Sequence, residues 1–188
     1  MAGLVRILIF ILAGTGVLLV GRGLWLPAKA LTAQILLHRA WETSQQSREI
    51  VKPWPWADTW PVGRLIAERA GVDQIILEGQ NGEALAFGPG HLPASAQPGK
   101  DGHCILSGHR DSSFAFLQHL QPGDELVLEG LSGTEKYLVE KLETVPTDSL
   151  YLNTELSGTL TLITCYPFRA VLPNTPLRFV VTAVSAAP

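Results

Sequence analysis

The chain has 188 residues, of which 46% are hydrophobic and 16% are charged, and its formal net charge is −3 at neutral pH. This length suits one folded domain with an additional segment. The slightly acidic balance excludes the broad basic surface on which nucleic-acid binding depends, so we expect no nucleic-acid partner.

The first segment is strongly apolar. Residues 7–21, ILIFILAGTGVLLVG, contain no charge and lie between Arg6 and Arg22. As a helix they span about 22 Å, and extension to residues 3–26 reaches the roughly 30 Å of a bilayer core, with Trp25 suited to the interface. We therefore predict that residues 1–27 are a membrane anchor or a signal segment. The tripeptide AKA at 28–30 fits a cleavage site, and both alternatives stay open.

The next segment combines an amphipathic pattern with a proline-rich one. Leu31, Ile35, Leu36 and Trp41 lie near helical spacing within residues 31–50, which favours a helical stalk. The sequence KPWPWADTWP at 52–61 resists regular structure and suits a linker that docks by its aromatic rings. We predict a stalk and linker over residues 28–57 and a folded domain over residues 58–188.

Short apolar runs then alternate with turns rich in glycine and proline. Runs typical of strands occupy residues 62–68, 74–79, 103–108, 125–130, 136–145, 159–166 and 177–184. Only SSFAFLQHL, at 112–120, is typical of a short helix. This pattern predicts a mostly β domain, either an antiparallel sandwich or a barrel.

The run TLITCYPF, residues 161–168, ends a predicted strand with a cysteine. Alternation puts Thr161, Ile163 and Cys165 on one face. Pro167 cannot continue a central ladder, so Cys165 lies at or beside the strand end. A cysteine at this position can be a half-buried residue that only packs, half of a disulfide with Cys104, a metal ligand or a nucleophile.

Two further segments supply the groups that a nucleophilic thiol needs. In SGHRDSSF, His109 lies at a strand-to-loop junction, and Gly108 before it permits close backbone approach. Acyl transfer also needs a charge that stabilises an oxyanion. Arg178 opens the last predicted strand, PLRFVV, and is preferred over its competitors Arg110 and Arg169 because that strand is expected to pair beside the one bearing the cysteine.

These segments resemble the sortase family. TLITC fits its cysteine signature, SGHRD its histidine segment, PLRFVV its last strand, and FGPGHLPASAQPGKDGH the stretch before the histidine. The likeness covers residues 62–184 in the same order, and CYPF resembles the proteobacterial members. The resemblance implies a closed β-barrel of about eight strands, preceded by a transmembrane helix, that acts as a cysteine transpeptidase.

The resemblance also implies roles and partners. Cys165 would be the nucleophile, His109 the general acid and base, and Arg178 the oxyanion-stabilising group, with Thr164 and Asp111 supporting them. The substrate would be an exported protein with an LPxTG-like C-terminal sorting signal, and the acceptor an amine on the cell surface. The catalytic domain would then lie outside the cytoplasmic membrane, on the periplasmic side in a Gram-negative cell, although the arginines flanking the anchor do not set this orientation.

Other interpretations stay open beside this one. A catalytically inactive, membrane-anchored barrel that binds a partner peptide is the main alternative, and a metalloenzyme is a weaker one. We expect neither a cofactor nor a metal, because no D-x-D-x-D cluster is present. Cys104 is expected to face the core. His91, His103 and His119 are expected to be surface or hydrogen-bonded structural residues, and Asp111 can equally cap the helix at 112–120.

Overall fold

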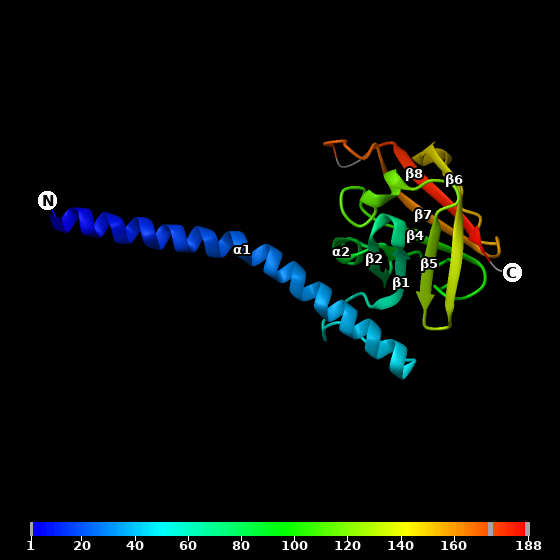
Figure 1. The fold of residues 1–188 in the computed structure, drawn as a ribbon, viewed down its shortest axis with the longest axis horizontal. Helices are drawn as coiled ribbons and strands as arrows, with labels where there is room; N and C mark the ends of the chain where they lie inside the picture. The colour runs from blue at the N-terminus through cyan, green and yellow to red at the C-terminus, as the bar shows by residue number, and fades with distance from the viewer. Residues whose placement is uncertain (1, 173–174, 187–188) are drawn as a thin grey trace. The chain divides into compact units, whose positions relative to one another are not determined.

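The computed structural model describes residues 2–172 and 175–186 (Figure 1). The chain forms two compact units, Met1–Leu36 and Leu37–Pro188. Helix α1, Ala2–Ser47, begins in the first unit and ends in the second, with Pro27 inside it. It is the one helix in the described residues that is long and apolar enough to cross a membrane, which makes it a candidate anchor.

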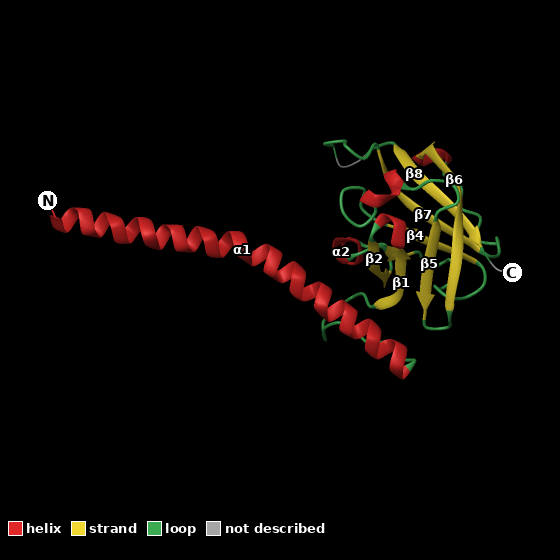
Figure 2. Ribbon diagram, in the orientation of Figure 1, coloured by secondary structure: helices red, strands yellow, loops and turns green. Residues whose placement is uncertain are grey.

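The second unit is a closed β-barrel with few helices, as the sequence predicted (Figure 2). Around the barrel the strand order is β1-β2-β3-β4-β7-β8-β6-β5. The pairs β2/β3 and β4/β7 are parallel and the others are antiparallel. The strands are β1 (Pro61–Ala67), β2 (Val72–Glu78), β3 (Gly90–His91), β4 (His103–Ser107), β5 (Glu125–Gly130), β6 (Thr134–Pro146), β7 (Thr159–Tyr166) and β8 (Leu177–Ser185).

The helical elements between the strands are short. They are α2 (Gly82–Phe87) and three short 3₁₀ helices, η1 (Glu68–Ala70), η2 (Ala115–His119) and η3 (Thr147–Ser149). The helix expected over residues 112–120 is therefore present as η2. Helix α2, strand β3 and the 3₁₀ helices η1 and η3 were not predicted. An Asn-Gly pair such as Asn81–Gly82 is typical of a turn, but here the Asn81 side chain accepts a hydrogen bond from the Ala84 amide at 2.8 Å and caps α2.

Alternation along the strands separates the barrel interior from its outer face. One buried cluster draws on β1, β2, β4, β5, β6, β7 and β8, so it fills the interior; Leu106, Leu162 and Val181 belong to it. The alternate positions Ile105, Ile163 and Val180 form a second cluster on the outer face of β4, β7 and β8. Leu92, Val145, Leu150 and Leu152 pack against this second cluster from outside.

The end of α1 and the linker pack on the barrel. Leu37 and Trp41 join Ile75 and Leu77 of β2 in a third buried cluster. The Trp54 ring meets Phe87 edge to face, whereas Trp56 is 79% exposed. The compact unit therefore begins at Leu37, and the second half of the segment predicted as stalk and linker belongs to the same unit as the barrel.

Candidate active site

Strands β7 and β8 bring Cys165 and Arg178 together. The two residues are direct partners in the antiparallel register, so their Cβ atoms lie about 5 Å apart on the same face. This is the outer face, because Ile163 and Val180 share it. Cys165 and Arg178 are both half-buried.

His109 lies two residues beyond β4, the parallel neighbour of β7. Ser107 pairs with Ile163, and the Gly108 amide donates to the Ile163 carbonyl at 3.2 Å. The Thr164 hydroxyl donates to the Gly108 carbonyl at 2.7 Å. The backbone that leads into His109 is thus fastened beside the residues that precede Cys165.

The loop after β4 is held from the interior side. The carbonyl of His109 accepts the Phe114 amide at 2.9 Å, and the Phe114 ring is fully buried. A Cβ atom at Gly108 would come within 2.8 Å of that ring, so glycine is needed for close approach and not for an unusual φ. The His109 side chain itself is exposed.

The Arg178 guanidinium is held by the loop between β7 and β8. Its Nη1 donates to the Thr175 carbonyl at 2.8 Å and to the Leu177 carbonyl at 3.0 Å. Of its sequence competitors, Arg169 is exposed, and Arg110 is buried with its guanidinium in the same loop. Asp111 is exposed at the surface.

The two cysteines lie in different environments. Cys104 belongs to the interior cluster, whereas Cys165 lies on the outer face, and both are free thiols. A disulfide between them is therefore absent. Burial, and to a smaller extent the Glu135 carboxylate, raises the pKa of the Cys104 thiol, so this thiol stays protonated.

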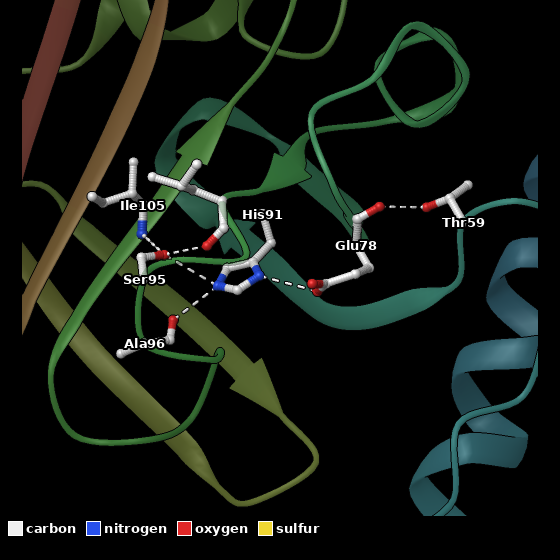
Figure 3. A network of polar contacts seen from close by, with 7 residues as sticks. Thr59, Glu78, His91, Ser95, Ala96 and Ile105 are labelled. Atoms are coloured by element: carbon white, nitrogen blue, oxygen red, sulfur yellow. Dashed lines mark hydrogen bonds and ion pairs between the residues drawn. The ribbon is translucent and has the colours of Figure 1, made fainter. Parts of the chain in front are cut away.

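The predicted structural histidines include two that are buried and hydrogen-bonded through both ring nitrogens. Figure 3 shows His91, whose Nε2 donates to the Ala96 carbonyl at 3.0 Å and whose Nδ1 lies 3.1 Å from Glu78 Oε2. His103 Nδ1 donates to the Asn153 carbonyl, and the Thr161 hydroxyl lies at its Nε2, both at 2.7 Å. Neither ring is available as a general base.

A hollow of about 330 Å³ lies on the outer face beside these elements. Its floor includes Thr161, Val180 and Val145, and its wall is the loop after β6, including Leu150 and Leu152. The hydrogen bond between His103 and the Asn153 carbonyl fastens this wall to the sheet. Sequence reasoning missed the hollow because its wall comes from a loop without a motif.

One buried polar atom on this face lacks a partner. The Ser107 hydroxyl oxygen is buried and has no hydrogen bond within the described ranges 2–172 and 175–186. It lies opposite Ile163 in the register and two residues before His109. In the same ranges no group of three His, Cys, Asp or Glu side chains is placed to hold a metal ion.

Comparison with known proteins assigns the chain to a protein family. The model of the sortase domain family matches residues 65–186, which include Cys165, His109 and Arg178. The chain belongs to the sortase family. Its similarity to the proteobacterial members in particular stays a prediction.

Relatives from several bacteria resemble the chain. Sortase D of Bacillus subtilis is 36% identical over 121 residues, which cover 63% of this chain and 61% of that protein. The chain thus spans less than two thirds of this relative's length. Sortase A from Corynebacterium diphtheriae is 25% identical with a TM-score of 0.60, covering 71% of this chain and 64% of that one. The Clostridium perfringens Sortase D5 transpeptidase has a TM-score of 0.63 at 21% identity, covering 83% and 99%, and supports the fold alone.

Proposed function

We propose that this sortase is a membrane-tethered cysteine transpeptidase. It would cleave an LPxTG-like C-terminal sorting signal of an exported protein and transfer the acyl part to an amine at the cell surface. Family and fold support a transpeptidase of the sortase type. The observation that carries the proposal for this chain is the direct pairing of Cys165 with Arg178, beside the backbone that leads to His109.

The first step would form a thioester. The proton of the Cys165 thiol passes to His109, and the sulfur attacks the carbonyl carbon of the threonine in the signal. The oxyanion of the tetrahedral intermediate lies against the positively charged guanidinium of Arg178. The carbon–nitrogen bond then breaks, and His109 donates a proton to the leaving amine. The acyl half stays on sulfur.

The second step would reverse this sequence with a new amine. His109 takes a proton as the acceptor amine attacks the thioester carbonyl, and the carbon–sulfur bond breaks. Arg178 again stabilises the oxyanion. Thr164 would support both steps by fixing the carbonyl of Gly108 before His109. Asp111, exposed in the same loop, would tune the electrostatic environment of the histidine.

The hollow on the outer face would take the part of the signal that precedes the cleaved bond. From Cys165 to Thr161 the strand advances four residues, or about 13 Å at 3.3 Å per residue. An extended peptide of the same length would reach from the sulfur to the hollow. The unpartnered Ser107 hydroxyl lies along this path and would gain a partner from the peptide.

The location of the enzyme follows from the same proposal. Helix α1 is a candidate single-pass anchor in the cytoplasmic membrane, and the substrate is exported, so the barrel would lie on the outer side. In a Gram-negative cell this is the periplasm. Removal of the segment as a signal peptide is the alternative, and the mass of the mature protein decides between them.

The test uses the full-length protein in detergent with a signal peptide and hydroxylamine. We expect a peptide hydroxamate by mass spectrometry, none from Cys165→Ala, and a kcat lowered about 10²- to 10³-fold by Arg178→Ala. Cys104→Ala is the matched control and should keep activity. Binding of the peptide without any hydroxamate would favour the alternative of an inactive peptide-binding barrel.

A further inference from the structure

Arg110, the residue after His109, is buried and reaches into the loop between β7 and β8. Arg110 is only 8% exposed. Nη2 donates to the carbonyls of Ala170 at 2.8 Å and Leu172 at 2.6 Å, and Nη1 donates to the Thr175 hydroxyl at 3.1 Å. One guanidinium thus fastens this loop at three points.

Thr175 connects the two arginines. Its hydroxyl accepts from Arg110, and its carbonyl accepts from Arg178 at 2.8 Å. Because the carbonyl and the hydroxyl belong to one residue, a shift of Thr175 moves a hydrogen-bond acceptor of Arg178. Arg178 in turn lies directly opposite Cys165 in the register.

In the part of this loop that the structure describes, residues 170–172 and 175, few other contacts hold the chain in place. Val171 is 98% exposed and Leu172 is 74% exposed, so neither anchors the loop in a core. At the loop's far end the Pro176 carbonyl accepts the amide and the hydroxyl of Thr147, at 2.8 and 2.9 Å. Arg110 holds the described residues Ala170, Leu172 and Thr175 between these ends.

Stability alone explains the buried guanidinium poorly. Within the described residues no carboxylate pairs with Arg110, since all three of its hydrogen bonds go to neutral oxygens. Burial of an unpaired cation carries a desolvation penalty that an apolar side chain would avoid. The planar guanidinium, however, holds three acceptors in a fixed fork geometry, which the single, freely rotating ammonium of a lysine does not provide.

We propose that Arg110 is a positioning residue for Arg178. It holds Thr175 so that the Arg178 guanidinium stays opposite the Cys165 sulfur, where the oxyanion forms. The inference rests on the proposed function and deepens it. Arg110 itself touches neither the sulfur nor the reacting carbonyl, and it acts through the loop.

The kinetic test measures hydroxamate formation by the full-length protein. Arg110→Gln and Arg110→Lys should lower kcat about 10- to 100-fold with KM nearly unchanged, since a misplaced group weakens transition-state binding. Thr175→Val should lower kcat in the same way, whereas Thr175→Ser keeps the hydroxyl and should restore it. Arg39→Gln, which changes an exposed arginine of α1, is the control and should leave kcat unchanged.

The decisive comparison is made in an Arg178→Ala background. If Arg110 acts through Arg178, Arg110→Gln should cause no further fall in kcat there, because the two effects are not additive. Additive losses would overturn the inference, as would an unchanged kcat in Arg110→Gln. A wild-type protein that forms no hydroxamate would instead contradict the proposed function and, with it, the inference.

A second measurement follows the loop without catalysis. Trypsin cleaves after Arg169, which is exposed at the start of this loop. We expect cleavage there to be at least several-fold faster in Arg110→Gln and Thr175→Val than in the wild type and in Arg39→Gln. Equal cleavage rates in all four proteins would show that Arg110 does not hold the loop.

Discussion

At the scale of single residues, the two cysteines lie on neighbouring strands but face opposite sides of the sheet. Cys104 lies in the barrel interior, where burial raises the pKa of its thiol, and Cys165 lies half-buried on the outer face. Reaction with an alkylating agent needs both access and a thiolate. The two thiols should therefore react at very different rates.

We expect iodoacetamide to label Cys165 in the folded protein and to leave Cys104 unmodified. Peptide mapping by mass spectrometry measures both positions, and Cys165→Ala should abolish labelling of the folded chain. In denaturant the two thiols of the wild type should react alike. Preferential labelling of Cys104 under native conditions would contradict the interior position.

Thr164 makes a second prediction at this scale. Its hydroxyl donates to the Gly108 carbonyl, so Thr164→Val should cost about 1 kcal/mol of stability and should also lower kcat by loosening the approach to His109. Thr164→Ser keeps the donor and is the matched control. Unfolding in urea and hydroxamate kinetics measure the two effects, and a valine variant with unchanged kcat would remove Thr164 from the positioning of His109.

The sequence could predict the positions of some of these residues relative to one another, but not of others. In the sequence, Cys165 ends a predicted strand, Arg178 opens the next one and His109 follows an earlier one. Pairing of consecutive strands alone suffices to suggest that Cys165 and Arg178 are neighbours. The link from Arg110 to Thr175 joins residues 65 positions apart through a loop without periodicity. No local pattern encodes such a contact, and Arg110 was accordingly considered only as a competitor of Arg178.

At the scale of elements, the seven strands predicted from short apolar runs between turns are all present. The four elements that escaped prediction are short: β3 has two residues, α2 has six, and η1 and η3 have three each. In β3 the pattern is too brief to show a period, and in α2 the cap residue Asn81 precedes a glycine, which is equally typical of a turn.

Asp101 joins two loops, and the hydrogen bonds it accepts should make the stability of the fold depend on pH. Its Oδ1 accepts from the Ser157 hydroxyl at 2.7 Å and from the amides of Gly102 and Gly158 at 2.8 and 3.3 Å. Hydrogen bonding to the Ser157 hydroxyl, and then to these amides, lowers the pKa of Asp101 in the folded state. Such a group stabilises the fold above its unfolded pKa of about 3.9 and loses this effect as the pH falls through its folded pKa.

Asp101→Asn should therefore be less stable than the wild type at pH 7, and the difference should shrink as the pH falls below about 3.9. Thermal unfolding at pH 7, 5 and 3 measures this trend. A stability difference that stays constant down to pH 3 would show that the carboxylate charge is not the cause.

At the scale of the whole molecule, the unit that contains the barrel begins at Leu37, before the start at residue 58 that the sequence composition suggested. The change from apolar helix to proline-rich linker indicated a boundary near residue 58, but Leu37 and Trp41 are buried with β2. Helical spacing predicted an apolar face that combined Leu31, Ile35, Leu36 and Trp41, whereas the buried face combines Trp41 with Leu37 and leaves Leu31 and Ile35 exposed. It could not identify what that face contacts, because the contact is with strand residues more than thirty positions away.

Trp41 is 2% exposed and Trp56 is 79% exposed, which provides a matched pair of substitutions. Trp41→Ala should lower the free energy of unfolding by about 3–5 kcal/mol, because it leaves a large cavity. Trp56→Ala should change it by less than about 0.5 kcal/mol. Denaturant unfolding of the full-length protein in detergent measures both. Equal effects would mean that α1 does not stabilise the unit that contains the barrel.

The closed order of strands restricts how an extended peptide can be recognised. Each of β4, β7, β8 and β6 already has a strand on either side, so a ligand on their outer face cannot join the sheet as another strand. If the hollow takes the sorting signal as proposed, selectivity would come from the side chains that line it and from the loop after β6. Replacing the loop after β6, while the pairing of the barrel strands stays unchanged, is therefore the most direct way to alter which peptide the enzyme would accept.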